Sequence, residues 1–84
     1  MSDIDIKVKM GDGTRSGAVR LDDGTMVSEL LKMVIEKWNL STSTSFDVTN
    51  ETRGNTNLQF NRSLAAQGVQ AGDDILVSAQ AVGG

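Results

Sequence analysis

The chain has 84 residues, with eight Lys and Arg against eleven Asp and Glu, which gives a formal net charge of -3. A chain of this length holds one hydrophobic core, so we expect a single domain. The acidic balance argues against nucleic acid as a partner, because nucleic-acid binding requires a basic face. The sequence has neither Cys nor His. It therefore lacks the thiol nucleophile, the imidazole base and the common zinc ligands, and we expect a protein that is not an enzyme and holds no metal.

Targeting signals are the next feature that the sequence can be searched for. No run of about 18 apolar residues occurs, as a membrane-spanning helix would need, and the first 25 residues contain no apolar secretory region. No polybasic cluster points to an anionic membrane surface. We therefore expect a cytoplasmic protein without a membrane partner.

The N-terminal half of the chain predicts a hairpin followed by a helix. Residues 4–10 alternate apolar and charged side chains, and residues 18–21 resume the alternation after a Gly-rich turn. A period of two is typical of a strand with one buried face. Thr25 is the expected helix N-cap. Residues 26–38 then carry an apolar stripe with helical spacing, whose last member, Trp38, is expected to cover the core.

The C-terminal half predicts shorter elements. In order they are a polar loop at 41–45, a strand at 46–48, a turn-rich segment at 50–57, a partner strand at 58–60, one helical turn at 64–69 and a last strand at 75–79. One helix can cover one face of the sheet, and the first and last strands can pair in parallel. We expect an α+β, two-layer β-grasp sandwich with a mixed sheet of four to five strands and one central helix.

This organisation assigns residues 1–79 to the domain and residues 80–84 to a flexible tail. The residues expected to share one core are Ile4, Ile6, Val8, Val19, Leu21, Val27, Leu30, Leu31, Val34, Phe46, Val48, Leu64, Val69, Ile75 and Val77. If Leu31 lies in that core, its replacement by Ala should lower stability by about 2–5 kcal/mol. The acidic pairs Asp22-Asp23 and Asp73-Asp74 stand alone, and we expect them to be solvated turn residues rather than metal ligands.

From Ser63 to the end, the sequence resembles the ubiquitin-like family. Ser63-Leu64 precedes a polar turn and Val69, a hydrophilic bend follows, and the last strand leads to Gly83-Gly84. The resemblance implies a protein modifier, bacterial or archaeal in style. Its C-terminal carboxylate would be adenylated by an E1-like activating enzyme that uses ATP. An E2-like enzyme would then help to join it to lysines of target proteins, and an isopeptidase would release it. The chain itself would bind no cofactor.

The tail is the one segment to which we assign chemistry. A diglycine without side chains can thread a narrow channel and bring its carboxylate to a nucleotide. Gly84 is therefore the expected point of activation and conjugation, with Gly83 beside it. Gln80, Ala81 and Val82 are the expected recognition residues, and Gln80 and Val82 stand where the family carries arginines. The expected acceptors for chain formation are Lys7, Lys9, Lys32 and Lys37.

A second departure from the family concerns the outward face of the sheet. The family presents an apolar patch there, whereas the corresponding positions here are polar or bare. These positions are Asp47 or Thr49, Ser78, and Gly11 or Asp12. We therefore expect receptors of the ubiquitin type not to bind, and the activating enzyme to be specific to this protein.

Two other readings remain open. Residues 72–75 with the terminal Val82-Gly83-Gly84 also resemble the sulfur carriers of thiamin and molybdopterin synthesis. These share the β-grasp fold and would carry a thiocarboxylate at Gly84. The third reading is a ubiquitin-like interaction module that does not conjugate, like the small ubiquitin-like proteins of bacterial secretion systems.

Overall fold

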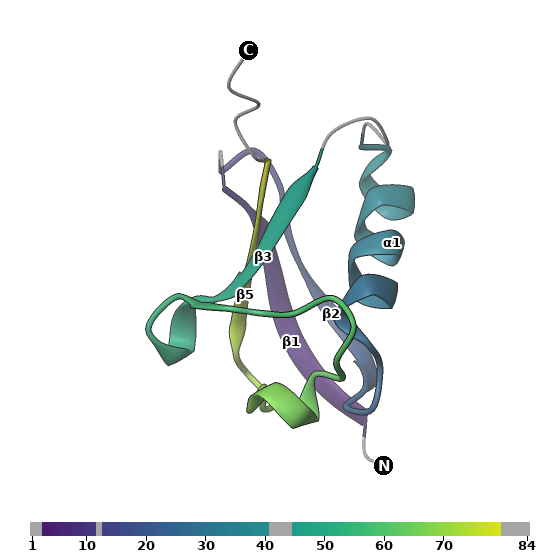
Figure 1. Ribbon diagram of the computed structural model, residues 1–84. Helices are drawn as coiled ribbons and strands as arrows, with labels where there is room; N and C mark the ends of the chain where they lie inside the picture. The colour runs from purple at the N-terminus through teal and green to yellow at the C-terminus, as the bar shows by residue number, and fades with distance from the viewer. Residues whose placement is uncertain (1–2, 12, 41–44, 80–84) are drawn as a thin grey trace.

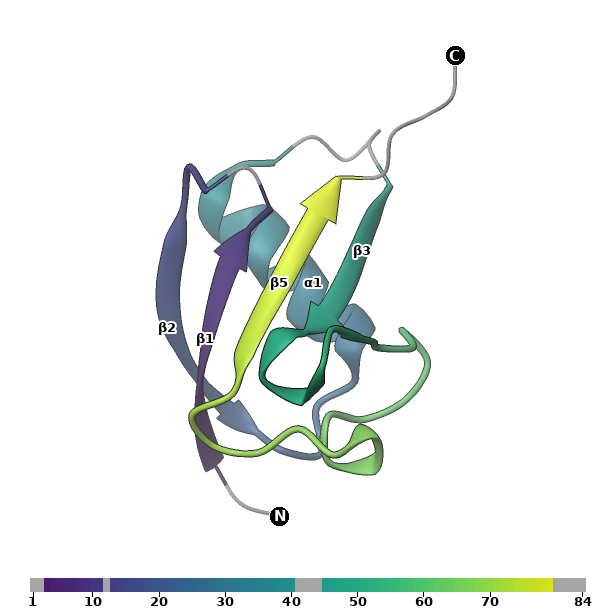
Figure 2. The same ribbon diagram turned by 90° about the vertical axis from the view of Figure 1, so that its left-hand side faces the viewer.

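The computed structural model describes residues 3–11, 13–40 and 45–79. They form a five-stranded mixed sheet with one helix lying across one face (Figures 1 and 2). The strands are β1 (Asp3–Met10), β2 (Ser16–Asp22), β3 (Phe46–Asn50), β4 (Thr56–Asn57) and β5 (Asp74–Ala79), in the sheet order β2-β1-β5-β3-β4. The helix α1 spans Val27–Trp38, and two 3-10 turns, η1 (Glu51–Arg53) and η2 (Ala65–Gln67), follow β3 and precede β5. This confirms the predicted α+β β-grasp fold.

The pairing of the strands follows from the alternation in the sequence. β1 pairs antiparallel with β2 to form the predicted hairpin, and it pairs in parallel with β5 through the crossover that contains α1. Ile6, Val8 and Met10 point to the helix side and are buried, while Lys7 and Lys9 between them are exposed. The inner face of the sheet is thus set by the period of two in the first strand.

The core lies between this face and α1. Within the described ranges, fourteen buried apolar residues form it, and α1 contributes Val27, Leu30 and Val34. The expected core members Ile4, Val19 and Leu31 are only partly buried. Val19 lies on the edge strand β2, which has a neighbouring strand on one side only. Leu31 lies beside the buried stripe of α1. All three side chains pack against the core as predicted, but the loss of about 2–5 kcal/mol expected for Leu31→Ala assumes full burial and is too large.

The start of α1 differs from the prediction. The N-cap position is Met26, in an extended conformation, and no side chain caps the helix. Carbonyls from a distant loop take over this role: Arg62 accepts from the Val27 N–H at 3.1 Å and Phe60 accepts from the Ser28 N–H at 3.1 Å. Thr25 therefore precedes the cap. No helix in the described parts of the chain is long and apolar enough to cross a membrane.

The predicted partner strand at 58–60 is also wrong. The pairing with β3 falls earlier, at Thr56–Asn57. Leu58 turns into the core, where its side chain is 6 % exposed. The chain then turns at Phe60, a residue that is 39 % exposed and whose carbonyl accepts a hydrogen bond at the start of α1. The predicted single turn at 64–69 is confirmed by η2, which Gly68 ends at a φ of 81°.

Candidate functional site

The tail begins at the centre of the sheet. β5 lies between β1 and β3, and its last residue, Ala79, pairs with Phe46. Ile75 and Val77 anchor the strand, because both are fully buried. The predicted tail residues Gln80, Ala81, Val82, Gly83 and Gly84 lie outside the described residues. Their chemistry therefore remains a prediction from the sequence.

A shallow hollow of about 330 Å³ lies where the tail begins, lined by Met10, Gly11, Ser78 and Ala79. The Gly11 N–H donates to the Val77 carbonyl at 2.8 Å, which ties the first turn to the end of β5. A Cβ atom at Gly11 would lie 2.6 Å from the Ser78 Oγ. A larger residue at position 11 would therefore displace the Ser78 side chain and fill the hollow.

The face of the sheet that points away from α1 is polar. Asp47 is exposed and lies opposite Ser78 in the β3–β5 pairing, as expected for a face without an apolar patch. Asp12 lies outside the described residues. The sequence analysis did not single out Leu76, which is half-buried and lies between Lys9 on β1 and Thr49 on β3. One aliphatic residue between polar neighbours does not form a large apolar surface.

The four candidate acceptor lysines lie in different surroundings. Lys9 forms an ion pair with Glu51, with 2.9 Å between its Nζ and the carboxylate Oε1. This hydrogen bond, with the attraction of the same carboxylate, raises the pKa of Lys9. Lys7 lies opposite Asp74 on the outward face, and Lys32 is exposed on α1. Because an amine must lose its proton to attack a carbonyl, this pairing disfavours Lys9 as a nucleophile.

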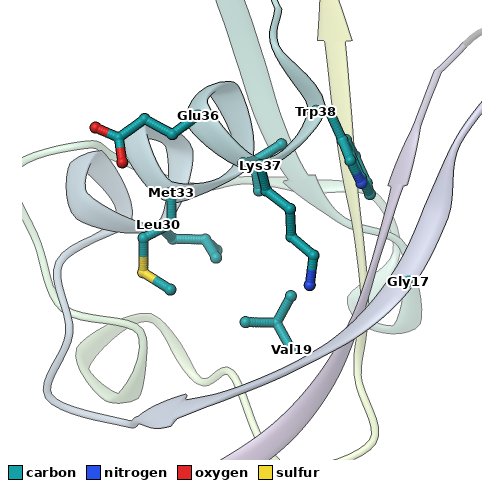
Figure 3. A pocket seen from close by; sticks show the side chains of 8 residues that line it. Gly17, Val19, Leu30, Met33, Glu36, Lys37 and Trp38 are labelled. Carbon is teal, nitrogen blue, oxygen red and sulfur yellow. The ribbon is translucent and has the colours of Figure 1, made fainter.

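Lys37 lines a groove between β2 and α1, of about 400 Å³ (Figure 3). Its lining is mainly apolar and includes Gly17 and Val19 from β2 and Leu30, Met33 and Trp38 from α1. In Figure 3 the Lys37 side chain reaches down toward Val19, with Trp38 on one side and Met33 on the other. Met33 is 45 % exposed. Sequence reasoning missed this groove, although Trp38 and Lys37 were both singled out.

A buried polar cluster joins the segment after β3 to the start of β5. The Asp73 carboxylate accepts hydrogen bonds from Asn50 Nδ2 at 2.9 Å and from the Gln70 N–H at 3.0 Å, and Arg53 Nε lies 3.4 Å from it. Asp73 is 3 % exposed and Asn50 is 1 % exposed. Asp73 is therefore not the solvated turn residue that the sequence predicted.

The electrostatics of Asp73 follow from these contacts. Burial alone would raise its pKa. The hydrogen bonds from Asn50 and Gln70, and the guanidinium of Arg53, favour the charged form more strongly, so the pKa lies below its ordinary value of 3.8. The charged carboxylate thus holds η1 and the turn before β5 together.

Comparison with known proteins places the fold. No protein-family model matches the sequence, and no curated protein matches it significantly. Among solved structures, it is similar to a Caldiarchaeum subterraneum ubiquitin, with a TM-score of 0.80, 20 % identity, and coverage of 99 % of this chain and 100 % of that one. It is also similar to the ubiquitin-like domain of Plasmodium falciparum Dsk2, with a TM-score of 0.77, 18 % identity, and coverage of 94 % and 100 %.

A third similar structure is the ubiquitin-like domain of an Arabidopsis thaliana protein, with a TM-score of 0.79 and 18 % identity over 98 % of this chain and 82 % of that one. Similarities at such low identity establish the fold and do not extend to activity. The chain therefore has a ubiquitin-like β-grasp fold, with a central last strand that leads into the tail.

Proposed function

We propose that this protein is a ubiquitin-like modifier of prokaryotic type. The Gly84 carboxylate is adenylated by an E1-like enzyme at the expense of ATP, passed to a partner cysteine, and joined as an amide to a lysine of a target protein. An E2-like enzyme and an isopeptidase would complete this system. The observation that supports the proposal most is the position of the diglycine, which ends five residues after β5 (84 - 79 = 5) on a ubiquitin-like fold.

The described residues support this proposal through the arrangement of the sheet. β5 pairs with a neighbouring strand on each side, so the core holds this strand in place when a partner binds the tail. The hollow at Gly11 and Ser78 offers a partner an open surface at the root of the tail. An enzyme that grips the uncharged Gln80-Ala81-Val82 sequence would meet this surface, and its specificity would differ from that of enzymes that read arginines.

The direct test removes the tail chemistry and leaves the fold intact. Deletion of Gly83 and Gly84 should abolish conjugation in cells of the native host, because the acyl group that is activated is lost. The melting temperature should stay unchanged, because the core residues all precede the tail. Conjugates that persist after the deletion would contradict the proposal.

The second candidate function is that of a sulfur carrier, in which sulfur replaces one oxygen of the Gly84 carboxylate. Intact-mass measurement of the protein from its native cell separates the readings: exchange of one oxygen for sulfur at Gly84 indicates the carrier, and high-mass adducts indicate the modifier. A protein of unmodified mass, with no adduct in the presence of the activating enzyme and ATP, would favour the interaction module. The ubiquitin-like domains among the similar structures make that third reading a real alternative.

A further inference from the structure

The groove between β2 and α1 lies beside a free sheet edge. Among the residues that the structure describes, β2 is the outermost strand and pairs with β1 only. The Arg15 carbonyl accepts from the Met10 N–H at 2.9 Å, so the backbone of Arg15 points toward β1. In an antiparallel pair this direction alternates along the strand, which leaves the N–H and C=O groups of Ser16, Ala18 and Arg20 at the outer edge. An extended segment can therefore add to β2 and place alternate side chains in the groove.

The floor of the groove is open because Gly17 has no side chain. A Cβ at Gly17 would lie 3.9 Å from the Trp38 Cζ2, which is ordinary contact distance. The space above Gly17 and Val19 is therefore large enough for a small aliphatic side chain. Apart from Glu36 and Lys37 the lining is apolar, and in Figure 3 the Glu36 side chain points away from Val19. The apolar part favours an uncharged segment, because a charged side chain would lose its hydration there.

The tail of this protein has that chemistry. Gln80-Ala81-Val82-Gly83-Gly84 is uncharged, contains one aliphatic residue of modest size and ends in residues without side chains. β2 begins at Ser16, next to Gly17 at the Trp38 end of α1. A tail that runs antiparallel to β2 would therefore place Val82 in the groove and Gly84 toward Lys37.

The length of the tail decides which copy supplies it. From Ala79, five residues reach at most ~17 Å. Reaching the outer edge of β2 from β5 requires crossing three strand spacings, about 14 Å in total. The tail of the same chain would have about one residue left to pair with β2. If this tail sequence lies along the edge, it therefore comes from a second copy.

We propose that the groove between β2 and α1 holds the C-terminal tail of a second copy, and that Lys37 is the preferred acceptor for joining one copy to the next. This inference rests on the proposed modifier function, because it requires an activated Gly84. The Lys37 amine attacks the activated Gly84 carbonyl, the C–N bond forms, the C–S bond of the thioester breaks, the thiolate leaves and one proton goes to solvent. The gain over other lysines comes from proximity.

The experiment uses a thioester of the full chain at Gly84, made chemically with 2-mercaptoethanesulfonate, so that no activating enzyme is needed. The thioester is left to react with itself at mildly alkaline pH, and the products are mapped by intact mass and by trypsin. Attachment at Lys37 leaves the branch on the peptide 33–53, whereas attachment at Lys32 leaves it on 21–37. We expect Lys37 to carry at least about ten times more product than any other lysine.

Two matched pairs of variants test the groove itself. Lys37→Arg should remove the main product, and Lys32→Arg, on the same helix, should not. Gly17→Val should fill the groove and reduce the Lys37 product to the level of the other lysines. Thr49→Val, on β3 beside Leu76 and outside the groove, is the control and should leave the product unchanged. Both variants should keep the melting temperature of the parent.

Three results would overturn the inference: equal product on Lys37 and Lys32, a Lys37 preference that survives Gly17→Val, or a cyclised single chain as the main product. Because the thioester is made without an enzyme, each of these results leaves the proposed modifier function to be judged by its own tests. Loss of conjugation in cells after deletion of the diglycine, with no Lys37 preference here, would keep the function and remove only this acceptor assignment.

Discussion

The layer between the sheet and α1 and the segment from Glu51 to Asp73 are held by different interactions. In the layer, Val8, Leu30, Ile75 and their neighbours are fully buried and apolar. The segment places Leu58, Leu64 and Val69 in the same core, and between these anchors its path is fixed by polar contacts that converge on Asp73 and Gln67. Apolar contacts in the layer are many and non-directional, so they stabilise the fold as a whole. The polar contacts are few and directional, so they determine the path of one segment.

The largest expected effect is in the apolar layer. Leu30→Ala should lower the free energy of unfolding by about 2–5 kcal/mol, because it leaves a cavity in a fully buried site. Chemical denaturation measures this loss. Leu31→Ala, one position along the same helix but only partly buried, should lower stability by less than half as much. Equal losses in the two variants would show that α1 presents a different face to the sheet.

Asp73→Ala comes next and addresses the polar segment. The variant leaves Asn50 buried without its carboxylate partner, and the loss of hydrogen bonds to a charged group should lower the free energy of unfolding by about 1.5–3 kcal/mol. Asp74→Ala is the matched control, because Asp74 is half-buried and its N–H, which donates to Thr52, is retained. A loss in Asp74→Ala as large as that in Asp73→Ala would contradict the role of the Asp73 carboxylate in fixing this segment.

The same carboxyl makes the stability depend on pH. Its pKa in the folded chain is below the ordinary value of 3.8, so the folded state binds its proton less tightly than the unfolded state does. This contribution is complete above the unfolded pKa and is lost as pH falls through the folded pKa. The difference in stability between the parent and Asp73→Asn should therefore shrink in acid, below about pH 4. A difference that grows in acid would reverse the assigned direction.

The smallest effect is expected at Gln67. Its side chain accepts from the Gln59 N–H at 2.6 Å and donates to the Gln59 carbonyl at 3.0 Å, which ties η2 to the turn before it. Because this contact is partly open to water, Gln67→Ala should lower stability by about 1 kcal/mol. Gln70→Ala, at an exposed position, is the control and should have no measurable effect. Indistinguishable melting temperatures for the two variants would show that Gln67 does not fix this segment.

The two regions also differ in how far the sequence predicts them. β1, β2, β5 and α1 carry periodic apolar patterns, because each has one face on the core, and a period can be read without knowing the partner. The polar segment has no period. The carbonyl of Phe60 at the start of α1 and the burial of Asp73 both depend on residues that are distant along the chain, so local rules favoured Thr25 as a cap and Asp73 as a solvated residue.

The candidate site divides in the same way. The lysines were predicted as exposed side chains of the charged faces, and the pattern of the strands and helix was sufficient for that. The groove beside Lys37 depends on Gly17 lying under Trp38, which requires the packing of β2 against α1. The chemistry of the tail is predicted from the sequence alone, because a diglycine indicates conjugation only when it follows a ubiquitin-like domain.

The central claim is that the Gly84 carboxylate becomes joined to lysines, and digestion of conjugates from the native cell tests it most directly. The last Lys or Arg is Arg62, so trypsin leaves residues 63–84 on the acceptor, which is 84 - 62 = 22 residues. A search for two-residue glycine remnants would miss every target. We predict this 22-residue branch on lysines whenever the activating enzyme and ATP are present. A thiocarboxylate at Gly84 with no such branch would contradict the modifier and establish the sulfur carrier.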